Sequence, residues 1–193
     1  MKKSLNFCLI LSMLLLLTGC GNKFEPTEST IFITSKGVVQ SAVIESFDKD
    51  YYKFDELKED VEKEVKSYCL DVNEEVITVT SLTETEDIVT LQMQYQTVED
   101  YAEFNDVILF SGTLTEAIAA GYQPGTLQDA AGQTVEIDLE KNGNLKVLIT
   151  EESICIQTSG KIKYVSDNVT ILNNKLARAL EAGKKHPAFV LYK

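Results

Sequence analysis

Short runs rich in valine, isoleucine and threonine recur along this chain, and turn residues separate each run from the next. Runs at 30–34 and 38–47 flank a Ser-Lys-Gly turn, and runs at 76–82 and 88–95 flank an acidic turn. Two β-branched runs joined by a short polar turn predict an antiparallel hairpin. We therefore expect two hairpins in the N-terminal half of the chain.

The C-terminal half predicts further strands. Runs at 134–139 and 144–150 are joined through Asn142-Gly143, and this dipeptide is the strongest short hairpin signal. Runs at 153–157 and 161–166 flank a Thr-Ser-Gly turn and predict a fourth hairpin. Segment 173–182 fits either a helix or a strand, because its leucines recur every four residues. We favour a strand, since strands precede this segment and the β-rich AFVLYK follows it.

A longer helix is predicted over 54–72. Its apolar residues recur every four positions, at Leu57, Val61, Val65 and Cys69, which is typical of an amphipathic helix. Asp55 is the expected N-cap, and Cys69 lies on the apolar stripe, which favours a packing role.

Two short helices are expected around a buried strand. Segment 97–104 predicts the first helix, and 107–112 predicts the strand. The second, over 113–121, has Thr113 and Glu116 at capping-box spacing and Gly121 as its stop. The predicted fold class is therefore α+β, a mostly antiparallel sheet of hairpins with one main amphipathic helix and one or two short helices.

The first 19 residues are typical of a secretory signal peptide. Lys2 and Lys3 precede an apolar stretch over 7–17 that is too short to span a bilayer. The stretch ends at Leu17-Thr18-Gly19-Cys20, which resembles the lipobox of bacterial lipoproteins. In such lipoproteins the cysteine sulfur receives a diacylglycerol, and signal peptidase II cuts the chain just before that cysteine.

The lipobox resemblance implies cleavage between Gly19 and Cys20 and lipidation of Cys20. Two acyl chains, such as palmitate, anchor a protein stably, at about 0.8 kcal/mol per buried methylene. The implied location is the extracytoplasmic face of the cell membrane. The implied organisation is a signal peptide over 1–19, a lipidated N-terminus and tether over 20–30, and one α+β domain over 31–193.

Two segments carry a second resemblance. GTLTEAIAAGYQPGTLQDAAGQ and GKIKYVSDNVTI resemble stretches of small, functionally uncharacterised lipoproteins of clostridial-type Gram-positive bacteria. This resemblance implies a single-domain architecture and transfers no active site.

Charge disfavours several classes of partner. Loss of Lys2 and Lys3 leaves 16 of the 18 basic residues against 30 acidic ones, a formal net charge of −14. Such a surface repels nucleic acid and anionic lipid headgroups.

Residues that commonly carry catalysis are few. His186 is the one histidine and is expected to be an exposed turn residue, without the partners that a nucleophilic or zinc site needs. Cys69 and Cys155 remain in the mature chain, and their spacing leaves open whether they form a disulfide. The glycines at 121, 125 and 132 lack phosphate-loop spacing. Asp48 and Asp50 begin a calcium-loop-like pattern that lacks its required glycine.

These observations predict a lipid-anchored extracytoplasmic protein that binds a partner or belongs to the cell envelope. We expect no enzymatic activity, cofactor or metal. One alternative is a solute-binding lipoprotein of a transport system, although importers of that kind are usually longer and two-lobed. Another alternative is a hydrolase that works through a pair of carboxylates.

Overall fold

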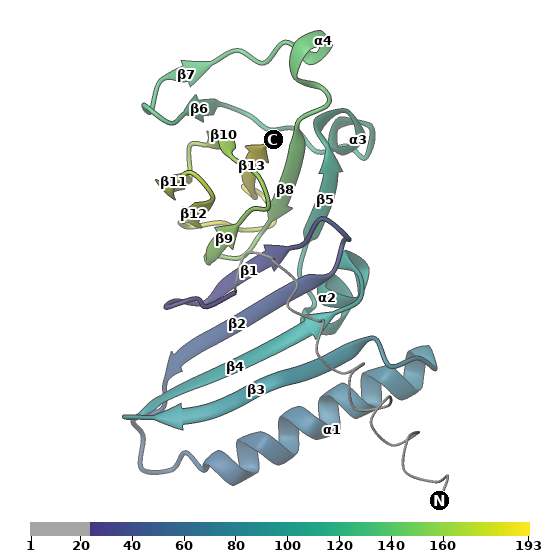
Figure 1. Cartoon of the computed structure of the whole chain (residues 1–193), viewed down its shortest axis with the longest axis vertical. Coiled ribbons are helices and arrows are strands. Elements are labelled where there is room, and N and C mark those ends of the chain that lie inside the picture. The colour runs from purple at the N-terminus through teal and green to yellow at the C-terminus, as the bar shows by residue number, and fades with distance from the viewer. Residues whose placement is uncertain (1–23) are drawn as a thin grey trace, which may run out of the picture.

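The computed structural model describes residues 24–193, drawn in colour in Figure 1. The described chain forms thirteen strands and four helices in two mostly antiparallel sheets, which confirms the α+β class. The elements in chain order are β1 Thr30–Ile33, β2 Val39–Ser46, α1 Phe54–Val72, β3 Ile77–Thr85, β4 Ile88–Tyr95, α2 Val98–Asn105, β5 Leu109–Thr113, α3 Leu114–Ala119, β6 Leu127–Asp129, β7 Thr134–Val135, α4 Leu139–Asn142, β8 Lys146–Thr150, β9 Cys155–Gln157, β10 Ile162–Ser166, β11 Val169–Asn173, β12 Leu176–Ala179 and β13 Ala188–Tyr192.

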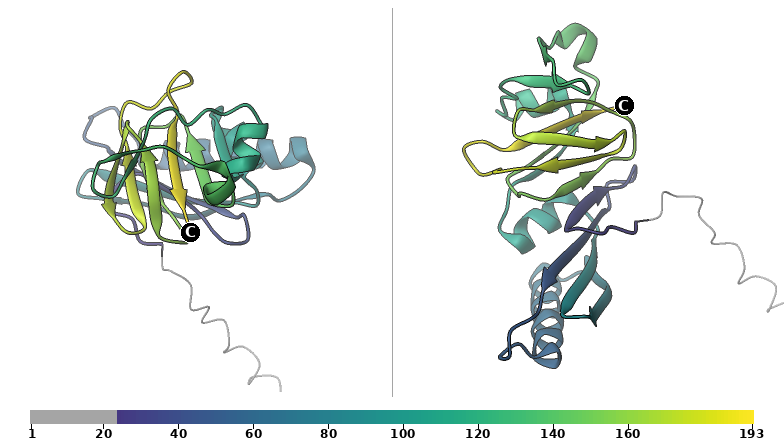
Figure 2. Two further views of the ribbon diagram at one scale, coloured as in Figure 1. Left: turned by 90° about the horizontal axis from the view of Figure 1, so that it is seen from above. Right: turned by 90° about the vertical axis from the view of Figure 1, so that its left-hand side faces the viewer.

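Two sheets share the strands. The seven-stranded sheet has the order β11-β12-β9-β1-β2-β4-β3, and the six-stranded sheet has the order β5-β8-β13-β10-β6-β7. β1 and β9 pair in parallel, and the other described strand pairs are antiparallel. Figures 1 and 2 place α1 beside β3 at the end of the molecule farthest from the six-stranded sheet.

The core has two parts because the six-stranded sheet is buried on both faces. On one face, Leu148 and Val190 pack in a cluster with residues of the seven-stranded sheet, such as Ile31. On the other face, Val147 and Phe189 pack in a second cluster beneath α3. Burial on both faces explains why β8 and β13 are nearly continuous apolar runs.

Locally encoded elements agree with the sequence predictions. The first two hairpins form as β1–β2 and β3–β4. Thr113 and Glu116 make both bonds of a capping box at the start of α3, and Gly121 follows the helix with φ +94°. Segment 173–182 contains strand β12, as favoured.

The hairpin predicted through Asn142-Gly143 is wrong. Asp138 accepts a hydrogen bond from the Glu140 amide and starts α4, a helix that the sequence analysis did not predict. Gly143 has φ −56°, whereas the two-residue hairpin turn requires positive φ. The flanking segments consequently separate, and β7 pairs with β6 while β8 pairs with β5 and β13.

The hairpin predicted between 153–157 and 161–166 is also wrong. β9 belongs to the seven-stranded sheet and β10 to the six-stranded sheet. The chain crosses between the sheets after Thr158, whose amide donates to the Lys175 carbonyl at 2.8 Å. The Lys161 amide then donates to the Lys193 carbonyl at 2.8 Å. The residues on both sides of the expected turn therefore form backbone hydrogen bonds with residues far away in the sequence.

The N-cap predicted at Asp55 is wrong as well. The N-cap is Lys53, two residues earlier, so α1 starts at Phe54, and Lys53 makes no side-chain capping hydrogen bond. Asp55 instead lies in the first turn, where a carboxylate interacts favourably with the helix dipole. No residue of α1 is fully buried, so the helix rests on the sheet through half-buried side chains.

Candidate functional site

The lipobox residues Leu17, Thr18, Gly19 and Cys20 lie outside the described residues, so their lipidation and cleavage stay predictions. The predicted tether overlaps the described chain at 24–30. There the Arg178 guanidinium contacts both carboxylate oxygens of Glu28 at 2.5 Å, and the Cys155 amide donates to the Ser29 carbonyl. No helix within residues 24–193 has the length and apolar character needed to cross a bilayer.

Within residues 24–193, no hydrogen bond or ion pair joins the other chemical candidates, His186, Cys69 and Cys155, to one another. His186 is exposed, as expected, and its Nε2 lies 3.0 Å from Asp167 Oδ1, a partner nineteen residues away that the sequence analysis missed. Cys69 on α1 is half-buried and Cys155 on β9 is buried, and both are free thiols. No cluster of three or more His, Cys, Asp or Glu side chains suited to a metal ion occurs among residues 24–193.

A partly buried polar contact joins α2 to the chain after β8. Tyr101 is 4% exposed, and its hydroxyl donates to Glu152 Oε2 at 2.8 Å. Burial raises the pKa of the Glu152 carboxyl above its ordinary value, and the bond from Tyr101 partly opposes that rise. Burial also raises the pKa of the Tyr101 phenol well above its ordinary value. The bond ties α2 to the chain that follows β8 and has a structural role.

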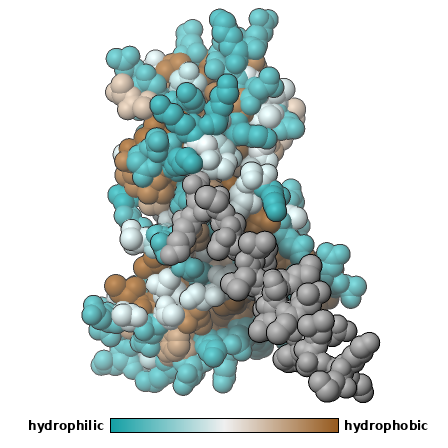
Figure 3. Space-filling view, viewed as in Figure 1, coloured by the Kyte–Doolittle hydropathy of each residue, from teal (hydrophilic) through white to brown (hydrophobic). Residues whose placement is uncertain are grey.

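An apolar groove lies between the C-terminal half of α1 and strand β3. Its volume is about 440 Å³, and its lining exposes more apolar than polar surface. The apolar side chains of the lining are Val65, Cys69, Leu70, Ile77 and Val79. Figure 3 shows the hydrophilic lower rim of the molecule, where α1 lies, with apolar patches above it to the left of the grey atoms.

Leu70 is the most unusual member of this lining, because it is 69% exposed on the surface of a helix. Leu70 follows Cys69 in the sequence, so it lies beside the apolar stripe of α1, and it is not part of the core cluster. Leu70 was not among the residues predicted from the sequence, although a leucine beside the apolar stripe of a helix was the available signal. Leu70 extends the apolar lining of the groove, and contiguous exposed apolar surface commonly marks an interaction site.

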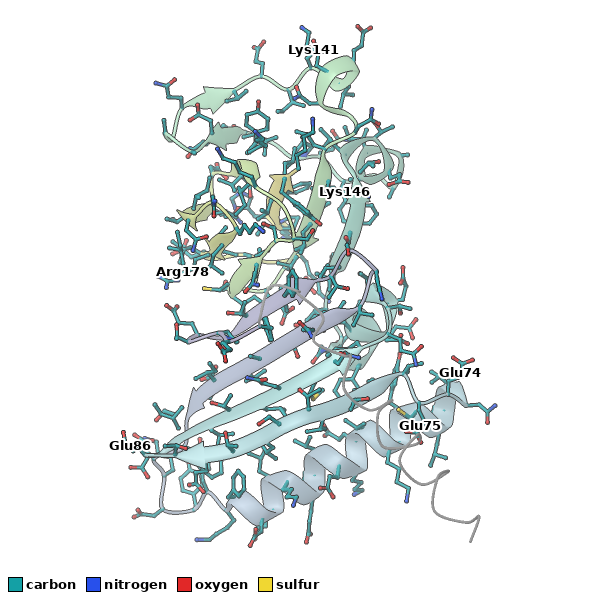
Figure 4. The ribbon with its side chains drawn as sticks, in the orientation of Figure 1. Glu74, Glu75, Glu86, Lys141, Lys146 and Arg178 are labelled. Atoms are coloured by element: carbon teal, nitrogen blue, oxygen red, sulfur yellow. The ribbon has the colours of Figure 1, made fainter. Side chains whose placement is uncertain are left out.

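The rim of the groove is acidic. Glu62, Glu74 and Glu75 line it together with one cation, Lys66. Figure 4 shows Glu74 and Glu75 where the end of α1 turns into β3. Asn73, the helix C-cap, has φ +57° and makes this sharp turn possible. The local potential consequently favours a basic ligand.

A second hollow, of about 670 Å³, lies at the opposite end of the molecule between α3, the β6–β7 hairpin and α4. Residues 123–127, from the loop after α3, line it and include Gly125, one of the glycines that lack phosphate-loop spacing. Leu114, Ile118, Leu127 and Ile137 line it, beside polar groups that include Gln123 and Glu136.

Comparisons of the chain with protein-family models, with curated proteins and with solved structures found no match. The function must therefore be inferred from the chain's own residues.

Proposed function

We propose that this protein is a lipid-anchored extracytoplasmic module, without enzymatic activity, that binds a protein partner. Partner binding is supported by the open groove between α1 and β3, which has the exposed Leu70 in its lining. The amphipathic helix α1 supplies one wall through a stripe that the sheet covers only in part. The LTGC sequence supports the anchor at Cys20.

The anchor is tested by detergent phase separation and acyl labelling of cells that express the full chain. Wild type should enter the Triton X-114 phase and incorporate a palmitate analogue, whereas Cys20→Ala should do neither. Cys69→Ala is the matched control, because it also removes one thiol and should remain lipidated. A Cys20→Ala protein that stays acylated would contradict the anchor.

The partner site is tested by photo-crosslinking in cells. A photoreactive amino acid replaces Leu70 in one variant and Glu64, an exposed α1 residue outside the groove lining, in another. An adduct specific to position 70, lost when Leu70's neighbours Glu74 and Glu75 are changed to lysine, supports the proposal. Equal adducts at both positions, or none at either, would overturn it.

The hollow near α3 favours a second candidate, a solute-binding lipoprotein. Its volume lies within the range of about 300–1,000 Å³ typical of small-molecule sites. A thermal-shift screen with sugars, amino acids and metal ions tests this candidate, because a ligand that binds only the folded state raises Tm. A ligand-dependent shift that Ile118→Glu abolishes would favour the solute-binding function.

A further inference from the structure

β3 is the last strand of the seven-stranded sheet, so one side of it has no strand neighbour within the described residues. The Gln96 amide donates to the Val76 carbonyl at 2.9 Å, so the backbone of Val76 faces β4. In an antiparallel pair, backbone groups alternate in direction. Those of Ile77 and Val79 therefore point away from β4, toward the groove.

Cys69 gives independent evidence for this orientation. Its Sγ lies 4.0 Å from the Ile77 carbonyl oxygen, as a weak donor from α1. The carbonyl thus faces the groove, and a thiol at that distance is a weak competitor for a backbone amide. Backbone donors and acceptors and apolar side chains consequently line the same space.

The available edge is short. The pairing of β3 with β4 shifts register between Val79 and Ser81, and the hydroxyl of Thr80, between them, donates to the Gln92 carbonyl at 3.0 Å. Bulges and charged side chains protect sheet edges from unwanted pairing. The strand beyond the bulge also carries exposed Glu84. The stretch from Ile77 to Val79 is therefore the part of this edge that lines the groove, and an incoming strand would replace the weak Cys69 contact at the Ile77 carbonyl.

We propose that an extended, basic segment of the partner adds as a strand to β3 at Ile77–Val79. Its apolar side chains would pack against Val65 and Leu70, and its lysine or arginine side chains would lie beside Glu74 and Glu75. This inference rests on the proposed function and specifies the chemistry of the partner. Strand addition supplies affinity through main-chain hydrogen bonds, and alternate side chains supply specificity.

Binding of a labelled, capped KVKVKVK peptide to the purified domain, measured by fluorescence anisotropy, tests the proposal. A peptide with N-methylvaline at its centre cannot donate the same main-chain bond and should bind about tenfold more weakly, or worse. An EVEVEVE peptide should not bind measurably, because its charges face the acidic rim. Equal binding of the parent and N-methylated peptides would overturn strand addition.

Protein variants locate the contact. Val79→Pro removes the outward amide, whereas Val79→Ala removes apolar atoms and keeps that amide, so the proline variant should lose more affinity. Glu74→Lys with Glu75→Lys should abolish binding. The control variant, Glu59→Lys with Glu64→Lys, makes the same change in net charge at exposed positions of α1. This control should still bind the peptide. Equal losses in the two charge-reversed variants would show non-specific attraction and overturn the proposal.

The two proposals can fail separately. A position-70 adduct in cells without binding of KVKVKVK overturns the basic-strand inference and leaves partner binding supported. Absence of both the adduct and peptide binding overturns the proposed function as well.

Discussion

Replacing Tyr101 by phenylalanine should destabilise the protein in a pH-dependent way. The change deletes one hydroxyl, which donates to Glu152 Oε2 at 2.8 Å. Hydrogen bonds to charged groups contribute about 1.5–3 kcal/mol, and Glu152 is half-buried, so the lower end applies. A loss of about 1.5 kcal/mol should lower Tm by roughly 3–6 °C in a domain of this size.

The sign of the pH dependence follows from the raised pKa of Glu152. Its carboxyl holds a proton more tightly in the folded than in the unfolded state, so its contribution to stability is complete at low pH. That contribution is lost as pH rises through the folded-state pKa. The Tyr101 hydroxyl stabilises the ionised carboxylate, and its removal should therefore cost more at pH 7 than at pH 4. Glu152→Gln should correspondingly gain stability relative to wild type as pH rises.

Urea unfolding at pH 4 and pH 7 measures these differences. Tyr122→Phe is the matched control, because the Tyr122 ring packs beside Phe110 and its hydroxyl has no hydrogen-bond partner among the described residues. It should change the free energy of unfolding by less than about 0.5 kcal/mol. An equal loss from Tyr101→Phe at both pH values would refute the assigned role of Glu152. The same conclusion would follow if Tyr101→Phe cost as much at pH 7 in a Glu152→Gln background.

Two further substitutions test the local structure. Thr113→Ala removes the capping box of α3 and should cost about 1 kcal/mol in urea unfolding, and an unchanged midpoint would contradict the cap. Gly160→Ala places a Cβ against the carbonyl oxygen of Lys193 and should cost about 1–3 kcal/mol by overpacking. Gly183→Ala, where a Cβ meets open space, is its control. Equal Tm values for the two alanine variants would contradict the crossing of the chain between the sheets at Gly160.

The sequence predicted those elements whose signals are local. The capping box at Thr113 and Glu116 acts within four residues, and the β3–β4 hairpin joins neighbouring runs. Pairing between distant segments left no comparable signal. β1 pairs in parallel with β9, which lies more than a hundred residues later in the chain. That contact decides which sheet β9 joins, and turn chemistry at 158–160 could not reveal it.

The groove was predictable only in its parts. The apolar period of 54–72 identified one wall, and the run at 76–82 identified the other. That β3 ends a sheet depends on every other strand finding its partners elsewhere, which is a property of the whole fold. The exposure of Leu70 likewise depends on how α1 packs against β3, which helical periodicity alone does not reveal.

The proposed anchor and the groove together limit where a partner can lie. Eight residue steps separate Cys20 from Glu28, which Arg178 holds against the domain, and they span at most about 28 Å. β3 lies three strands from β1 in the sheet, which is about 14 Å, and Ile77 is level with Ile33, which lies five residues and about 17 Å along the strand from Glu28. A segment that adds to β3 at Ile77 must therefore lie within roughly 50 Å of the bilayer. We accordingly expect the partner segment to belong to a membrane protein or to the membrane-proximal envelope. Lengthening the chain between Cys20 and Glu28 should therefore leave the affinity of the purified domain for the peptide unchanged. The same change should alter the position-70 adduct in cells.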